Sequence, residues 1–94
     1  MREMVKKALR ITASAFDDEV DLLIASARAD LIRVGVSSVL AEKDDDPLVA
    51  TAIIWFCKAR FGFDNPEAER MEKIYEMCRA ELALSTGYKE EKTP

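Results

Sequence analysis

The chain has 94 residues, of which 49% are hydrophobic and 34% are charged, a composition typical of one small folded domain and not of a disordered chain. Its formal net charge of −4 excludes the basic excess that gives nonspecific nucleic-acid binders their affinity for phosphate. The sequence contains no histidine, which removes the commonest general base and metal ligand. We therefore expect a protein that is not an enzyme.

The two cysteines, Cys57 and Cys78, stand apart and form no CxxC pair, so they signal neither a zinc site nor a redox dithiol. We expect both to be small buried hydrophobes in a reducing compartment. The sequence signals no cofactor and no metal. No apolar run approaches the roughly 18 residues of a membrane span, and residues 1–10 lack the apolar core of a signal peptide. We expect a soluble intracellular protein that binds no membrane.

Two helices are predicted in the first third of the chain. A short amphipathic pattern with one basic face predicts a helix over residues 2–10. A regular 3.6-residue period predicts a longer helix over residues 15–34, with Ser14 or Thr12 as its N-cap and carboxylates in its first turn. Gly35 follows as a left-handed stop.

Residues 36–46 are predicted as a solvated loop in which Ser37 and Ser38 are able to start a short turn and residues 42–46 form a mostly acidic stretch; a partner-facing loop is the alternative. Asp46 and Pro47 together form a strong helix start, an acidic N-cap followed by proline in the first turn. The helix predicted over residues 47–61 has almost no polar face. Such a helix lies either at the centre of a core or against another subunit, and a chain this small covers a central helix poorly.

The last helix is predicted over residues 66–85, because Asn65 and Pro66 repeat the cap-then-proline signal. Its charged outer face is expected to be solvated. No strand-like alternation and no internal repeat interrupts the pattern. We therefore predict an all-α fold, a compact bundle of about four helices in a single domain over residues 1–87, followed by a polar tail over residues 88–94.

Aromatic side chains are the candidate interaction residues. Base stacking on them would need a positively charged groove, which the sequence does not offer, so most are expected in the core. We predict Trp55, Phe63 and Tyr88 as interface residues, because aromatic side chains bury a large area at low entropic cost. The alternative is a small regulatory or adaptor module similar to a helix-turn-helix protein, although no helix carries convincing base-reading side chains.

Several segments form a combination that is more specific than any single helix pattern. They are residues 5–11, 18–20, 27–31, 46–48, 52–53, 61–70 (FGFDNPEAER), 75–76 and 82–85 (LALS). The FGFDNPEAER stretch and its distance to LALS are the most specific parts. In this order, the segments resemble the head-tail connector proteins of tailed bacteriophages and prophages, also described as DNA packaging proteins. The resemblance covers nearly the whole chain to Tyr88.

The resemblance implies a structural protein that assembles with itself into a ring of about twelve copies, with no catalytic residues. Such a ring lies below the portal protein at the head-tail junction of the virion, extends the DNA channel and receives the tail or a stopper protein. Assembly would take place in the cytoplasm of the bacterial host. Twelve copies at −4 would sum to about −48, a field that would let DNA slide past without sequence-specific binding.

Overall fold

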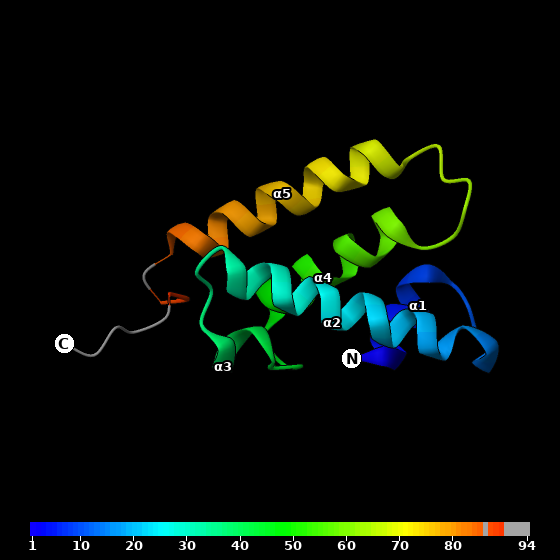
Figure 1. Cartoon of the computed structure of the whole chain (residues 1–94), viewed down its shortest axis with the longest axis horizontal. Helices are drawn as coiled ribbons and strands as arrows, with labels where there is room; N and C mark the ends of the chain where they lie inside the picture. Colours follow the sequence, from blue (N-terminus) through cyan, green and yellow to red (C-terminus); the bar gives the residue numbers. More distant parts are fainter. Residues whose placement is uncertain (86, 90–94) are drawn as a thin grey trace.

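A computed structural model describes residues 1–85 and 87–89. Within these residues the protein is all-α, which confirms the predicted fold class. The elements are α1 (Arg2–Leu9), the 3₁₀ turn η1 (Ser14–Phe16), α2 (Asp17–Arg33), α3 (Ser38–Ala41), α4 (Pro47–Arg60) and α5 (Ala68–Leu84). The molecule is elongated, 47 × 25 × 18 Å. Figure 1 shows the α4–α5 loop at one end of the long axis, and α3 with the last described residues at the other.

The start of α2 differs from the prediction. Neither Ser14 nor Thr12 caps the helix, because the 3₁₀ turn η1 runs directly into α2. Asp17 in the first turn accepts a hydrogen bond of 2.7 Å from Lys6 of α1 and thereby ties α1 to α2. The predicted stop is confirmed: Gly35 has a φ of 107°, a left-handed conformation that glycine adopts without strain.

The segment between α2 and α4 is not simply the solvated loop that was predicted. It contains the short helix α3, and both Val36 and Ala41 are fully buried. Val36 also pairs with Lys89, and the amide of Ser37 donates a hydrogen bond of 2.7 Å to the carbonyl of Tyr88. The start of the predicted polar tail is therefore bound to this segment. Residues 90–94 of that tail lie outside the described residues.

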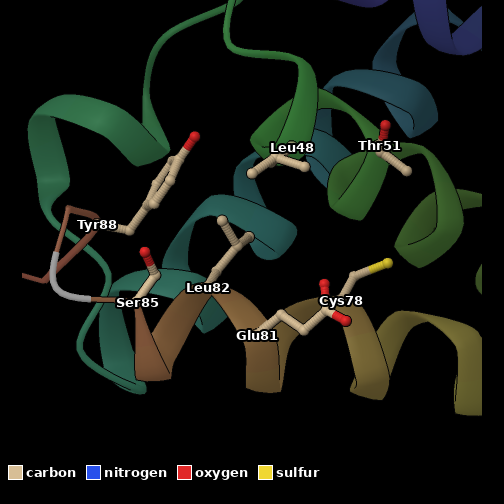
Figure 2. Close-up of a pocket in the computed structure, with 7 residues that line it drawn as sticks. All are labelled: Leu48, Thr51, Cys78, Glu81, Leu82, Ser85 and Tyr88. Carbon is tan, nitrogen blue, oxygen red and sulfur yellow. The ribbon is translucent and has the colours of Figure 1, made fainter.

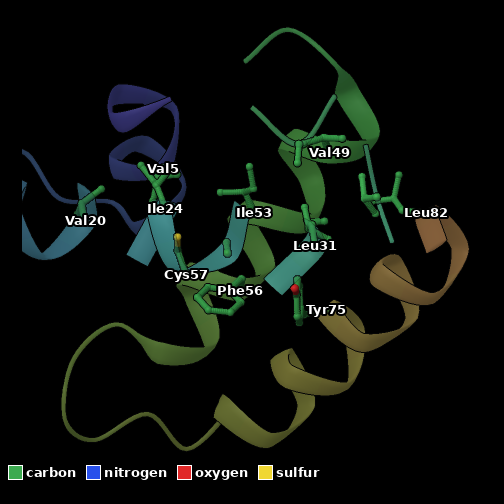
Figure 3. Packing of buried hydrophobic residues seen from close by; sticks show 14 residues of the cluster. Val5, Val20, Ile24, Leu31, Val49, Ile53, Phe56, Cys57, Tyr75 and Leu82 are labelled. Carbon is green, nitrogen blue, oxygen red and sulfur yellow. The ribbon is translucent and has the colours of Figure 1, made fainter. Parts of the chain in front are cut away.

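The helix α4 begins as predicted and occupies the centre of the fold. The Asp46 carboxylate accepts hydrogen bonds from the amides of Leu48 (3.0 Å) and Val49 (3.1 Å), and Pro47 takes the first turn. The helix packs against α1, α2 and α5. Figure 3 shows the buried side chains converging on it, among them Val5, Leu31 and Tyr75. The chain thus covers one side of α4 by itself.

The beginning of α5 is later than predicted. The side-chain oxygen of Asn65 accepts a hydrogen bond of 3.0 Å from the Glu67 amide, but this bond closes a turn before the helix, which starts at Ala68. The amide group of the same side chain donates to the Lys58 carbonyl at 2.9 Å. Asn65 therefore holds the α4–α5 loop against the end of α4.

A polar network bridges α2 and α5. Asp30 of α2 accepts hydrogen bonds from Tyr75 (2.5 Å) and Arg79 (2.9 Å) of α5 and from Arg33 (2.8 Å). Burial opposes the ionisation of Asp30, but these hydrogen bonds outweigh it and lower its pKa to about 2. Burial raises the pKa of Tyr75, and its bond to Asp30 raises it further. At neutral pH the network therefore holds an ionised carboxylate and a neutral phenol.

The cysteines fit their predicted role in part. Cys57 is fully buried, and burial raises the pKa of its thiol to about 12. Cys78 is only partly buried on α5. In the part of the chain that the structure describes, no helix is both long enough and apolar enough to cross a membrane.

Candidate interaction surface

An apolar groove lies between the beginning of α4 and the end of α5. Its volume is about 230 Å³. Figure 2 shows the residues that line it, which are Leu48, Thr51, Cys78, Glu81, Leu82, Ser85 and Tyr88. We call it the α4–α5 groove. The aliphatic, thiol and aromatic groups among these side chains suit an apolar occupant, with Glu81 as the one charge among them.

Local structure explains why these side chains meet. Leu48 lies in the first turn of α4 and is 54% exposed, whereas Val49 and Ala50 of the same turn face the core and are buried. Cys78 and Leu82 are four residues apart and therefore share one face of α5. After Ser85 the chain turns back, and the Tyr88 amide donates a hydrogen bond of 3.0 Å to the Ser85 carbonyl. This turn brings Tyr88 to the end of the groove.

Tyr88 forms one wall of the groove and is partly buried. Its hydroxyl donates to the Asp46 carboxylate, with oxygen distances of 3.0 and 3.2 Å, and this hydrogen bond raises the pKa of Tyr88. Its ring packs against the core cluster. One face of Tyr88 is thus used within the chain, and the other lines the groove.

Phe63 lies on the α4–α5 loop between Arg60 and Ala68. Figure 1 shows this loop at the opposite end of the long axis from α3 and the last described residues. Its side chain is fully exposed, at 109% of the reference area. The loop turns at Gly62, whose φ is 84°. Beside it, Phe61 and Phe16 stack edge to face with ring centroids 5.5 Å apart. Phe63 therefore projects into solvent beside this aromatic pair.

Trp55 lies in the middle of α4, between these two places. It is partly buried and packs against the core cluster. The Lys58 ammonium group lies 4.7 Å from the centre of its ring, a cation–π contact that covers part of the exposed face. The three predicted interface residues thus lie apart along the long axis, and they stay a prediction.

The match to known families covers almost the entire chain. Residues 1–89 match the family model described as phage connector protein. The chain belongs to the phage connector protein family. No curated protein and no solved structure matched it.

Membership in the phage connector family confirms the family that the sequence motifs indicated. A connector is a structural component of the phage particle, so the family gives this chain a connector role, contacts with other virion proteins and a place in the virion. These contacts need surface that the isolated chain leaves uncovered. The α4–α5 groove and Phe63 are two such places on this phage connector.

Sequence reasoning missed the groove itself. Leu48, Cys78 and Leu82 each read as core positions of an amphipathic pattern, and the sequence spacing does not show that α5 leaves the first turn of α4 open. One signal was present: the helix from residue 47 has more apolar positions than a small chain covers. That surplus pointed to an interface of this connector but not to its place.

Proposed function

We propose that this connector forms a ring of about twelve copies below the portal protein, extends the DNA channel there, and joins the head to the tail or to a stopper protein. The proposal is supported by the family and carried by one observation, the apolar surface that the chain leaves uncovered. Large apolar side chains are exposed on α4, α5 and the loop between them. They are Leu48, Phe63, Met77 and Leu84.

Exposed apolar side chains gain free energy when a partner covers them, so these positions are candidate contacts with other proteins. The exposed apolar surface includes a concave site, the α4–α5 groove, and a projecting side chain, Phe63, on the loop at the other end of the two helices. A ring needs this kind of asymmetry, since each subunit in a cyclic assembly presents two different surfaces to its two neighbours.

The charge of the chain supports a passive role toward DNA. At −4 per copy, a ring in which enough of this charge faces the channel would disfavour tight contact with phosphate. The role needs no catalysis. Retention of duplex DNA by assembled rings at physiological salt would contradict this part of the proposal.

The decisive experiment is assembly with and without purified portal protein, followed by negative-stain microscopy and light scattering. We expect assemblies of about twelve subunits at high protein concentration or on the portal. A strict monomer that ignores the portal would contradict the proposal and would favour the alternative, a small regulatory or adaptor module with another partner.

Phe63→Ala is expected to weaken assembly at least ~10-fold, because exposed aromatic side chains are the commonest energetic anchors of interfaces. The change should leave the free energy of unfolding within about 0.5 kcal/mol of wild type, since Phe63 is fully exposed. Light scattering over a concentration series measures the first effect, and urea unfolding measures the second.

The matched control for this variant is Leu22→Ala. Leu22 is also an exposed apolar residue, at 69%, but it lies on α2. Assembly that is unchanged in Phe63→Ala, or equally weakened in both variants, would remove Phe63 from the interface. Tyr88→Ala is a poorer test, because it also breaks the hydrogen bond to Asp46 within the chain.

A further inference from the structure

The α4–α5 groove and Phe63 are complementary features of the same chain. The groove is apolar and open, and Phe63 is the most exposed large apolar side chain of the described residues. Phe63 cannot fill the groove of its own chain. Leu48 and Arg60 are twelve residues apart on α4, which places the loop about 18 Å from the groove's Leu48 edge.

The size of the groove fits one aromatic side chain. Its volume of about 230 Å³ accommodates a phenyl ring between Leu48, Leu82 and the ring of Tyr88. A phenyl ring that packs against the Tyr88 ring would gain edge-to-face or offset stacking in addition to the area that it buries. Asp46 holds Tyr88 in position through its hydroxyl, so the wall exists before an occupant arrives.

The surface area that one Phe63 side chain would bury shows whether this contact alone could hold two subunits together. A phenylalanine side chain buries about 150–250 Å², whereas a stable interface between two proteins buries about 1,200 Å² or more. One such contact cannot hold two subunits together by itself, and it would act as an anchor within a larger interface. Repeated from subunit to subunit, it becomes stable when the assembly closes on itself, as a head-to-tail contact does in a ring.

We propose that Phe63 of one subunit inserts into the α4–α5 groove of a second copy of this chain, an inference that rests on the proposed self-assembly. Each copy then gives one aromatic side chain to one neighbour and receives one from the other. The contact is heterologous, so it propagates around the ring and does not stop at a dimer.

The chain carries a cysteine in the right place to test this. Cys78 lines the groove, whereas Cys57 is fully buried. In Phe63→Cys, oxidation with copper phenanthroline should join the new thiol of one copy to Cys78 of the next. Nonreducing electrophoresis should then show a ladder of dimers, trimers and longer chains. Burial raises the pKa of the Cys78 thiol, so the reaction is run at alkaline pH.

The control is the double variant Phe63→Cys with Cys78→Ser. A bond between two introduced cysteines ends at a dimer, so this variant should lose every band above the dimer. Adding Ser85→Cys, a second position in the groove, should restore the ladder. Wild-type protein, which lacks the thiol at position 63, should give no ladder.

Assembly is measured separately on each variant by light scattering, with portal protein present. Assembled Phe63→Cys protein without bands above the dimer would overturn the groove contact and leave the ring proposal standing. A ladder that persists in the Cys78→Ser control would also overturn it. Failure of wild-type protein to assemble at all would overturn the proposed function, and this contact with it.

Discussion

Asp30→Ala is expected to lower the free energy of unfolding by about 2–4 kcal/mol. The substitution removes the acceptor of the fully buried Tyr75 and the partner of the half-buried Arg79, which together join α5 to α2. A buried hydroxyl without an acceptor carries its full desolvation cost, so the loss exceeds the net worth of one hydrogen bond. Urea unfolding followed by circular dichroism measures it.

Two controls separate the parts of this network. Arg33→Ala removes the donor whose side chain is 67% exposed and should cost less than about 1 kcal/mol. Tyr75→Phe in the Asp30→Ala background should recover part of the loss, because it removes the orphaned hydroxyl. An equal loss of unfolding free energy in Asp30→Ala and Arg33→Ala would show that the buried hydrogen bonds to α5 add no stability beyond that of the exposed one.

The pH dependence of the free energy of unfolding, compared between wild type and Asp30→Ala, gives a second measurement. The pKa of Asp30 is about 2 in the folded protein against an ordinary value of 3.8. A lowered folded pKa means that the ionised group stabilises the fold above pH 3.8 and that this contribution is lost as the pH falls toward 2. The stability difference between wild type and Asp30→Ala should therefore shrink through that window. A constant difference would contradict the ionic role of Asp30.

Phe56→Ala is expected to be the most destabilising single change considered, at about 3–5 kcal/mol. Phe56 lies on the buried side of α4, only 5% exposed, and stacks edge to face on Tyr75 with ring centroids 5.1 Å apart. The Arg60 guanidinium lies 3.7 Å from the centre of its ring. Truncation leaves a cavity where α2, α4 and α5 meet and removes both aromatic contacts.

Thermal and urea unfolding measure this effect, and Phe56→Leu is the matched variant. Leucine keeps much of the volume but loses the aromatic contacts, so its cost should be less than half that of alanine. A loss below about 1 kcal/mol for Phe56→Ala would mean that the core collapses around the site, contrary to the central position of α4.

Local signals predicted the helices well because they act within a few residues. The cap at Asp46 and the glycine at position 35 do what their chemistry predicts. Two local signals failed, since neither Ser14 nor Thr12 caps α2 and Asn65 closes a turn ahead of α5. The segment between α2 and α4 was misread for a different reason. Val36 and Ala41 are buried by tertiary contacts, since Val36 pairs with Lys89 and α3 packs against α2. A segment of mixed composition therefore reads as a solvated loop although α3 lies within it.

The candidate surface was predictable only as a tendency. The excess of apolar residues in α4 indicated that part of the helix surface would stay uncovered. In the structure, Ile53 lies on the buried side of the helix and Leu48 on its exposed side. Tyr88 was predicted at an interface, and no local pattern shows that its hydroxyl donates to Asp46, 42 residues earlier. Likewise Arg79 was expected on the solvated face of the last helix, because its pairing with Asp30 joins two helices that no local pattern connects.

The hydrogen bonds of Tyr88 make one backbone amide a reporter for the groove. The Tyr88 ring lines the groove, while its carbonyl accepts the Ser37 amide at 2.7 Å, outside the groove and ahead of α3. An occupant that shifts Tyr88 exposes that amide to solvent, and one that clamps Tyr88 shields it. The exchange rate of a single hydrogen on Ser37 therefore records whether the groove is filled, with no label in the groove itself.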